Sequence, residues 1–150
     1  MPIFKPFESE NRNCKFGGFR ITAFDVPHDN CPCFGFFIRH KDEKIIYITD
    51  AEYCGYVFKS LEPTILLVEC NHQDEYLNSD EIKYNHSLRG HLSLETCKEF
   101  IKANDNPSLK QIVLLHPSKD ALDKTEALAE IKSITDKPVC FAEKGMVIEV

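Results

Sequence analysis

The sequence has no apolar run that approaches the roughly 18 residues of a membrane span. Its N-terminus also has no basic segment leading into a long apolar run, the pattern that marks a secretory leader. Internal repeats, low-complexity tracts and linkers are absent as well. The 150 residues, of which 43% are hydrophobic, therefore predict one globular cytoplasmic domain with a core of its own.

An excess of positive charge is also absent. The formal net charge of −6 argues against a broad nucleic-acid-binding face, although a local basic patch is compatible with an acidic protein. A nucleic-acid substrate would have to be attracted by such a local basic patch.

A disulfide framework is not indicated, because the seven cysteines are odd in number and scattered. Cys70 ends an apolar run, which suits a buried free thiol in a reducing compartment. Cys31 and Cys33 near His28 offer a rival metal site or nucleophile. The single proline between them points the thiols apart on an extended segment, whereas zinc sites place two to four residues between paired cysteines.

Apolar runs bounded by turn residues predict strands, and apolar residues at helical spacing predict helices. Strands are expected at residues 19–26, 34–40, 44–49, 64–70, 111–115, 139–142 and 146–150. Helices are expected at 94–104, with Ser93 as N-cap, and at 120–134, while 71–77 is a loop entering a short helix and 78–90 a polar stretch.

This order predicts an α+β (α/β) fold, a mixed sheet with helices on one face. Residues 1–18 form an N-terminal arm in this interpretation, and residues 19–150 form the domain.

Three of the expected strands end at a potential metal ligand. His28, Asp50 and His116 each follow a strand-like run, in that order along the chain. Loops directly after strands are where rigid scaffolds place chemistry, so we expect the three side chains to converge at one edge of the sheet. The alternatives left open are a solvent-facing His28, a capping role for Asp50 and an ordinary strand exit at His116.

The stretches "FRITAFDVPHD", "KIIYITD", "ILLVECNHQDEYL", "LRGHLS" and "IVLLHPS" resemble, in the same order, the C-terminal half of metallo-β-lactamase-fold hydrolases. The nearest similarity is to their phosphodiesterase and nuclease-like members. The resemblance implies one half of an αββα sandwich. The principal ligand motif of that family, His-x-His-x-Asp-His, occurs nowhere in this sequence.

The resemblance implies a role for each of the three strand-end residues. His28 would bind a first metal, Asp50 would bridge two metals and take part in catalysis, and His116 would bind the second metal. Zinc or manganese would lower the pKa of a bound water for attack on phosphorus or a carbonyl. Only two protein ligands per metal remain, so binding by this chain alone is expected to be weak or absent.

Two further motifs resemble family signatures. "VECNH" implies that Asn71 lies beside the metal site, while "LRGHLS" makes Arg89 and His91 candidate contacts for an anionic, phosphate-containing substrate, with His91 also catalytic. A structural interpretation of the second motif stays open, with Gly90 in a turn and His91 bonded to a carbonyl.

Three other histidines are expected to have no role in the site. His72 would belong to the exposed start of a helix, and His40 and His86 lie in polar connections where they would be solvated.

The resulting hypothesis is a metal-dependent hydrolase-like protein of the phosphodiesterase or nuclease type, truncated and with an incomplete site. The alternative is a non-catalytic binding or regulatory module that keeps the fold. Half a sandwich would expose an apolar sheet face, so a homodimer or a complementary second chain is expected to cover it.

Overall fold

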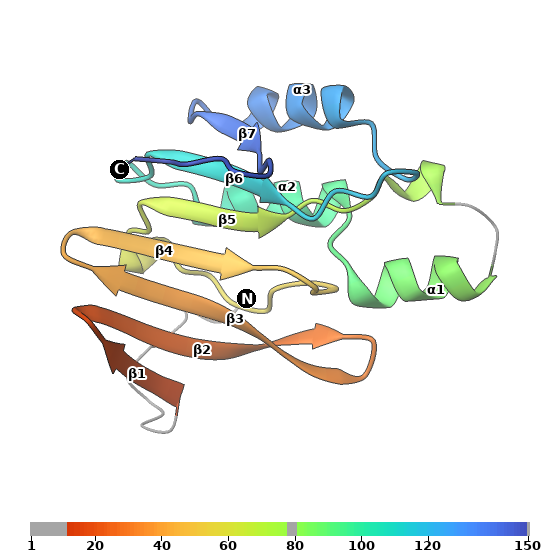
Figure 1. Ribbon diagram of the computed structural model, residues 1–150. Helices are drawn as coiled ribbons and strands as arrows, with labels where there is room; N and C mark the ends of the chain where they lie inside the picture. Colours follow the sequence, from red (N-terminus) through yellow and green to blue (C-terminus); the bar gives the residue numbers. More distant parts are fainter. Residues whose placement is uncertain (1–11, 78–80, 150) are drawn as a thin grey trace.

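The computed structural model describes residues 12–77 and 81–149 and contains one mixed seven-stranded sheet (Figure 1). The strands lie side by side in sequence order: β1 (Asn13–Phe16), β2 (Phe19–His28), β3 (Cys31–His40), β4 (Glu43–Ile48), β5 (Ile65–Glu69), β6 (Gln111–Leu115) and β7 (Val139–Phe141). Strands β1 to β4 pair antiparallel, and β4 to β7 pair parallel. Strands β2, β4, β5 and β6 therefore all run in one direction and end at the same edge.

In the described part of the chain, three α-helices accompany the sheet: α1 (Glu81–Gly90), α2 (Leu94–Asn104) and α3 (Lys124–Ile134). Helix α2 contacts β5 and α3, and α3 contacts β7, so these two helices form a layer on one face. Helix α1 instead lies beyond the strand ends and contacts β2 (Figure 1). The short 3-10 helices η2 (Lys59–Leu61) and η3 (Asp74–Tyr76) lie in the connections.

The core lies between the sheet and the helix layer. Leu66 and Val68 of β5 are fully buried there with Ile101 of α2 and Ile131 of α3. Because successive strand residues point to opposite faces, Leu67 points to the other face, where it is only half-buried. The helices thus cover one face of the sheet and leave apolar side chains on the other, as expected.

The helix caps follow from the sequence. Ser93 accepts a hydrogen bond from the Thr96 N–H at the start of α2, as predicted. Helix α3 begins later than expected, because Asp123 is its N-cap and accepts from the N–H groups of Thr125 and Glu126.

Four expectations about the elements were wrong. Part of the expected arm forms β1, which pairs with β2, while residues 1–11 lie outside the described part of the chain. The polar stretch at 78–90 contains α1, whose sequence has little apolar periodicity to reveal it. The helix expected within 71–77 is only the single 3-10 turn η3. Residues 146–149 form no strand.

All seven cysteines are free, as the sequence indicated. Burial raises the pKa of the Cys54 thiol to about 12, and Cys97 is fully buried beside Cys70. Among the described residues, no helix has both the length and the apolar character required to cross a membrane.

Candidate functional site

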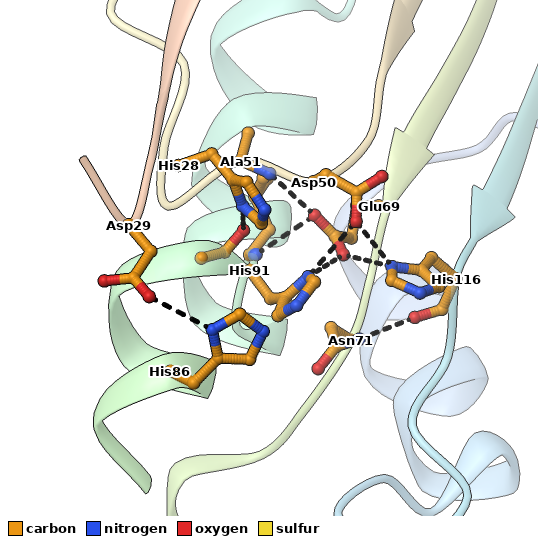
Figure 2. A network of polar contacts seen from close by, with 11 residues as sticks. His28, Asp29, Asp50, Ala51, Glu69, Asn71, His86, His91 and His116 are labelled. Carbon is orange, nitrogen blue, oxygen red and sulfur yellow. Dashed lines mark hydrogen bonds and ion pairs between the residues drawn. The ribbon is translucent and has the colours of Figure 1, made fainter. Parts of the chain in front are cut away.

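Polar side chains gather at the sheet edge where the co-directional strands end. His28 is the last residue of β2, Glu69 the last of β5, and His116 directly follows β6. Asp50 follows β4 by two residues, and His91 follows α1. The common strand direction brings four of these side chains to one place, and helix α1, which contacts β2, brings His91 to them (Figure 2).

The loops that carry these residues are held to one another by backbone hydrogen bonds. The N–H of Glu52 donates to the carbonyl of Pro27 at 2.8 Å, and that of Asn71 donates to Leu92 at 2.9 Å. The N–H of Ser118 in turn donates to the Asn71 carbonyl at 2.8 Å. The edge is therefore a connected scaffold rather than a set of independent loops.

Glu69 lies at the centre of the cluster and is 0% exposed. Its Oε1 lies 2.7 Å from Nδ1 of His91 and 2.8 Å from Nδ1 of His116. Its Oε2 accepts from the backbone N–H groups of Ala51 at 3.1 Å and Leu92 at 3.4 Å. A buried carboxylate is costly unless hydrogen-bond donors of the protein surround both of its oxygens, as they do here. Glu69 thereby holds both imidazoles and two loops in place.

Asp50 completes a group of four possible metal ligands with Glu69, His91 and His116. One ligand atom of each lies within 4.8 Å of all the others, and no other such group occurs among the residues that the structure describes. Asp50 Oδ1 lies 3.4 Å from Nδ1 of His116 and 3.8 Å from Nδ1 of His91. The Asp50 distances are similar to those between ligands bound at about 2.0–2.2 Å to one zinc ion, so the group could hold one divalent cation.

Two residues of this group are among the six non-glycine residues with positive φ in the described part of the chain. Asp50 and His116 both have left-handed backbone, with φ values of 51° and 52°. Left-handed conformations are uncommon outside glycine and cluster at functional sites when the surroundings impose them. Their presence at two converging side chains supports a functional interpretation of this edge.

His91 is the most enclosed imidazole of the cluster, with a side chain only 11% exposed. Its hydrogen bond to Glu69 raises its pKa, an effect that burial opposes and that the charges of Glu69 and Asp50 reinforce. The ring therefore holds a proton more readily than an ordinary histidine, as a group that moves protons near neutral pH must.

His28 lies beside this group but outside it. Its Nδ1 lies 2.7 Å from the carbonyl oxygen of Gly90, and its ring centroid lies 5.4 Å from that of His91. The structure thus places all three predicted metal ligands at one edge, with Asp50 and His116 in contact and His28 on the far side of His91.

Asn71 and Arg89, which were also predicted to contact a substrate, lie at two different places near the site. Asn71 is buried, and its Nδ2 donates to the His116 carbonyl at 2.8 Å, which holds the loop that presents His116. Arg89 is exposed in the last turn of α1, where its carbonyl accepts from the N–H of Asp29 at 2.8 Å. Contact of either residue with a substrate stays a prediction.

His72 was wrongly assigned to an exposed helix start, since it is 1% exposed. Its Nε2 lies 3.3 Å from Asp74 Oδ1, while its Nδ1 has no hydrogen-bond partner. Burial lowers its pKa. A cavity of about 230 Å³, lined by His72, His91, Tyr53 and Ser93 among others, opens between it and the cluster.

Glu69 and His86 were missed from the sequence. Glu69 ends a continuous apolar strand, an unusual place for a charge, and it is the first residue of the Glu-x-Asn signature in "VECNH". His86 was interpreted as solvated, and its side chain is indeed 53% exposed. Its Nδ1 nevertheless lies 3.2 Å from Asp29 Oδ2, and its ring lies beside those of His28 and His91.

The sequence matches no protein-family model and no curated protein. Solved structures are similar to it in fold. The metallo-β-lactamase-fold protein YhfI from Bacillus subtilis superposes with a TM-score of 0.69 at 19% identity over 95% of this chain. A diphosphatase from the PhnP family gives 0.59 at 14% over 95%, and zinc-bound PqqB from Methylobacterium extorquens gives 0.60 at 15% over 93%.

These similarities confirm the metallo-β-lactamase-type fold inferred from the sequence motifs. The chain covers 53%, 47% and 54% of those three proteins, so it spans about half of their length. At such low identity the comparison establishes the fold alone.

Proposed function

We propose that this chain is the metal-binding half of a metal-dependent hydrolase of the phosphodiesterase or nuclease type. The observation that carries the proposal is the convergence of Asp50, Glu69, His91 and His116 at one strand edge. A diphosphatase and a zinc-bound protein among the similar structures support it.

The chemistry of the cluster fits a zinc or manganese ion. Glu69 is a fully buried carboxylate close to Asp50, so two carboxylates stand next to the imidazoles of His91 and His116. A divalent cation would balance these charges, since buried charges are costly unless paired or metal-bound. Asp50, Glu69 and His116 would supply the three protein ligands that catalytic zinc sites use.

Bound there, such a cation would lower the pKa of a water and polarise a phosphoryl or carbonyl oxygen. His91, fixed by Glu69 through Nδ1, would present its Nε2 toward the cavity it lines, for binding or for proton transfer. Exposed Arg89 at the end of α1 would attract a phosphate-containing substrate.

The test is hydrolysis of bis(p-nitrophenyl) phosphate with added Zn²⁺ or Mn²⁺. We expect turnover that disappears with EDTA and falls below detection in His116→Ala and Asp50→Asn. His40→Ala is the matched control, because His40 ends β3 at the opposite edge and stacks on Phe19. Equal rates in wild type and His116→Ala would refute the proposal.

A non-catalytic binding or regulatory module is the second candidate. It is favoured by the hydrogen bonds of Glu69, which satisfy the carboxylate through protein donors alone. This candidate predicts metal-independent stability and no hydrolysis in the same assay.

We further propose that a second copy of the chain covers the helix-free sheet face. Tyr47 and Leu67 are half-buried on this face, whereas Ile65 and Val113, which also lie outside the main core cluster, are already covered by the chain's own residues. The partly exposed apolar side chains are the surface that a second copy would cover.

A further inference from the structure

A cavity of about 230 Å³ adjoins the proposed metal group, because His91 belongs to both. A water molecule takes about 30 Å³ in the liquid, so this cavity has room for about seven groups of that size. That volume suits one part of a small organic molecule. Besides His91, the walls of the cavity include Glu52, Tyr53, His72, Asp74 and Leu88.

The charges in the cavity wall are negative. Glu52 and Asp74 carry carboxylates, and no lysine or arginine is among the described residues that line the cavity. A cleft lined by charges of one sign attracts ligands of the opposite sign. The wall therefore favours a cationic group and disfavours a phosphate.

The side chains at this cavity are not arranged to hold a metal ion. Within the described ranges 12–77 and 81–149, the ligand atoms that come close enough together for one ion belong to the proposed metal group alone. Glu52, His72 and Asp74 form no such group. The cation that fits here is therefore polyatomic, with several hydrogen-bond donors spread over a larger volume than an ion.

His72 supplies a buried hydrogen-bond acceptor in the wall. Its Nε2 lies 3.3 Å from Asp74 Oδ1, but neither ring nitrogen makes a hydrogen bond of good geometry in the part of the chain that the structure describes. Burial lowers the pKa of this ring, so the ring is neutral at pH 7 and one of its nitrogens carries a lone pair. A buried acceptor without a donor is costly, and an N–H group of a ligand would remove that cost.

Tyr53 and Leu88 complete the match to an aminoalkyl chain. The Tyr53 ring is 50% exposed, and the face of such a ring attracts a cation. Leu88 offers apolar surface to methylene groups. A primary ammonium group has three N–H donors, which suit the two carboxylates and the His72 acceptor.

We propose that this cavity binds a short alkyl chain that ends in a primary ammonium group, and that the substrate is a phosphodiester of such an amino alcohol. With its phosphoryl group at the metal group, the substrate would extend past His91 into the cavity. The phosphodiester part of this inference rests on the proposed function, whereas the ammonium site rests on the cavity alone.

The ammonium site is tested by NMR titration in EDTA at neutral pH, with 5-amino-1-pentanol as the cation and 1,5-pentanediol as its neutral counterpart of equal length. We expect saturable shifts of the Tyr53 and His72 ring resonances, with an affinity about 5-fold or more higher for the amine. Glu52→Gln and Asp74→Asn should each weaken binding of the amine about 2- to 5-fold. Equal affinities for the two alcohols, or no shift at tens of millimolar amine, would overturn the inference.

Glu75→Gln is the matched control. Glu75 is exposed in η3 beside Asp74 but does not line this cavity. The substitution removes the same charge, and it should leave the affinity for the amine unchanged. A loss equal to that of Asp74→Asn would show general attraction to an acidic protein and would contradict the site. Melting temperatures near that of wild type exclude unfolding as the cause of a loss.

The substrate class is tested by the release of p-nitrophenolate from 5-aminopentyl p-nitrophenyl phosphate and from pentyl p-nitrophenyl phosphate. We expect kcat/KM to be about 5-fold or more higher for the aminopentyl ester. Glu52→Gln combined with Asp74→Asn should remove this preference and leave the rate on bis(p-nitrophenyl) phosphate unchanged. Hydrolysis without the preference overturns this inference and leaves the proposed function standing. Amine binding without any hydrolysis supports the ammonium site and contradicts the proposed function.

Discussion

At the scale of single residues, the buried Glu69 carboxylate organises the site. It accepts from two imidazoles through Oε1 and from two backbone N–H groups through Oε2. Glu69→Gln keeps the shape but turns an NH₂ group toward one pair of donors. We expect a loss of about 2–4 kcal/mol in the free energy of unfolding, measured by urea denaturation in EDTA.

The control is Glu75→Gln, since Glu75 lies exposed in η3. That substitution should change stability by no more than about 0.5 kcal/mol. A Glu69→Gln protein as stable as this control would contradict the central role of the carboxylate.

His72 gives a prediction about pH. Burial lowers its pKa below the ordinary value of about 6.5, so in this window the unfolded chain binds a proton that the folded chain does not. The contribution of His72 to the free energy of unfolding therefore falls as the pH drops from about 6.5 toward the lowered pKa.

His72→Leu removes this proton linkage. We expect the variant to gain stability over wild type progressively as the pH is lowered from 7 to 5, measured by denaturant unfolding in parallel buffers. The raised pKa of His91 acts in the opposite direction: its stabilisation is full below about 6.5 and is lost as the pH rises through its folded pKa. His91 is present in both proteins, so a stability difference that is independent of pH would refute the prediction.

At the scale of elements, the end of α1 is fitted to β2. The Gly90 carbonyl binds His28, and a Cβ at Gly90 would lie 3.1 Å from Cε1 of that ring. Gly90→Ala should therefore displace His28 and cancel the gain of up to about 1 kcal/mol that replacing a helical glycine gives.

The displacement can be measured from the ring resonances of His28 by NMR. Ser87→Ala, in the same helix, is the control and should leave those resonances in place. If Gly90→Ala stabilises the protein and does not move the His28 signals, the fit between α1 and β2 is looser than the contacts indicate.

At the scale of the whole molecule, the sheet has one face without helices. Tyr47 and Leu67 lie there half-buried. We expect a two-fold dimer at tens of micromolar, with an interface of at least about 1,000 Å², measured by sedimentation velocity.

Leu67→Glu should shift the protein to monomer, because it places a charge at the centre of that face. Ser133→Glu in α3, on the opposite side, should leave the dimer intact. A wild-type monomer over the whole concentration range would contradict the proposal of a second copy.

The sequence by itself determined the sheet-forming runs and the order of the strand ends. Continuous or alternating apolar residues predict strands locally, and β2 to β6 occur close to the expected positions. Strand direction then forces His28, Asp50 and His116 to one edge, so their approach was predictable without coordinates. The polar α1 and the short β1 were not predictable, because tertiary contacts and pairing with β2 decide them.

Only the tertiary structure decided which side chains touch. Glu69 is central because the β5 end lies between the loops of Asp50, His91 and His116, and sequence spacing does not encode that neighbourhood. His86 joins His28 because α1 packs on β2, across 58 residues of sequence. The chemistry of this edge is thus carried partly by residues with no local signal, since contact between distant segments arises only when the whole sheet forms.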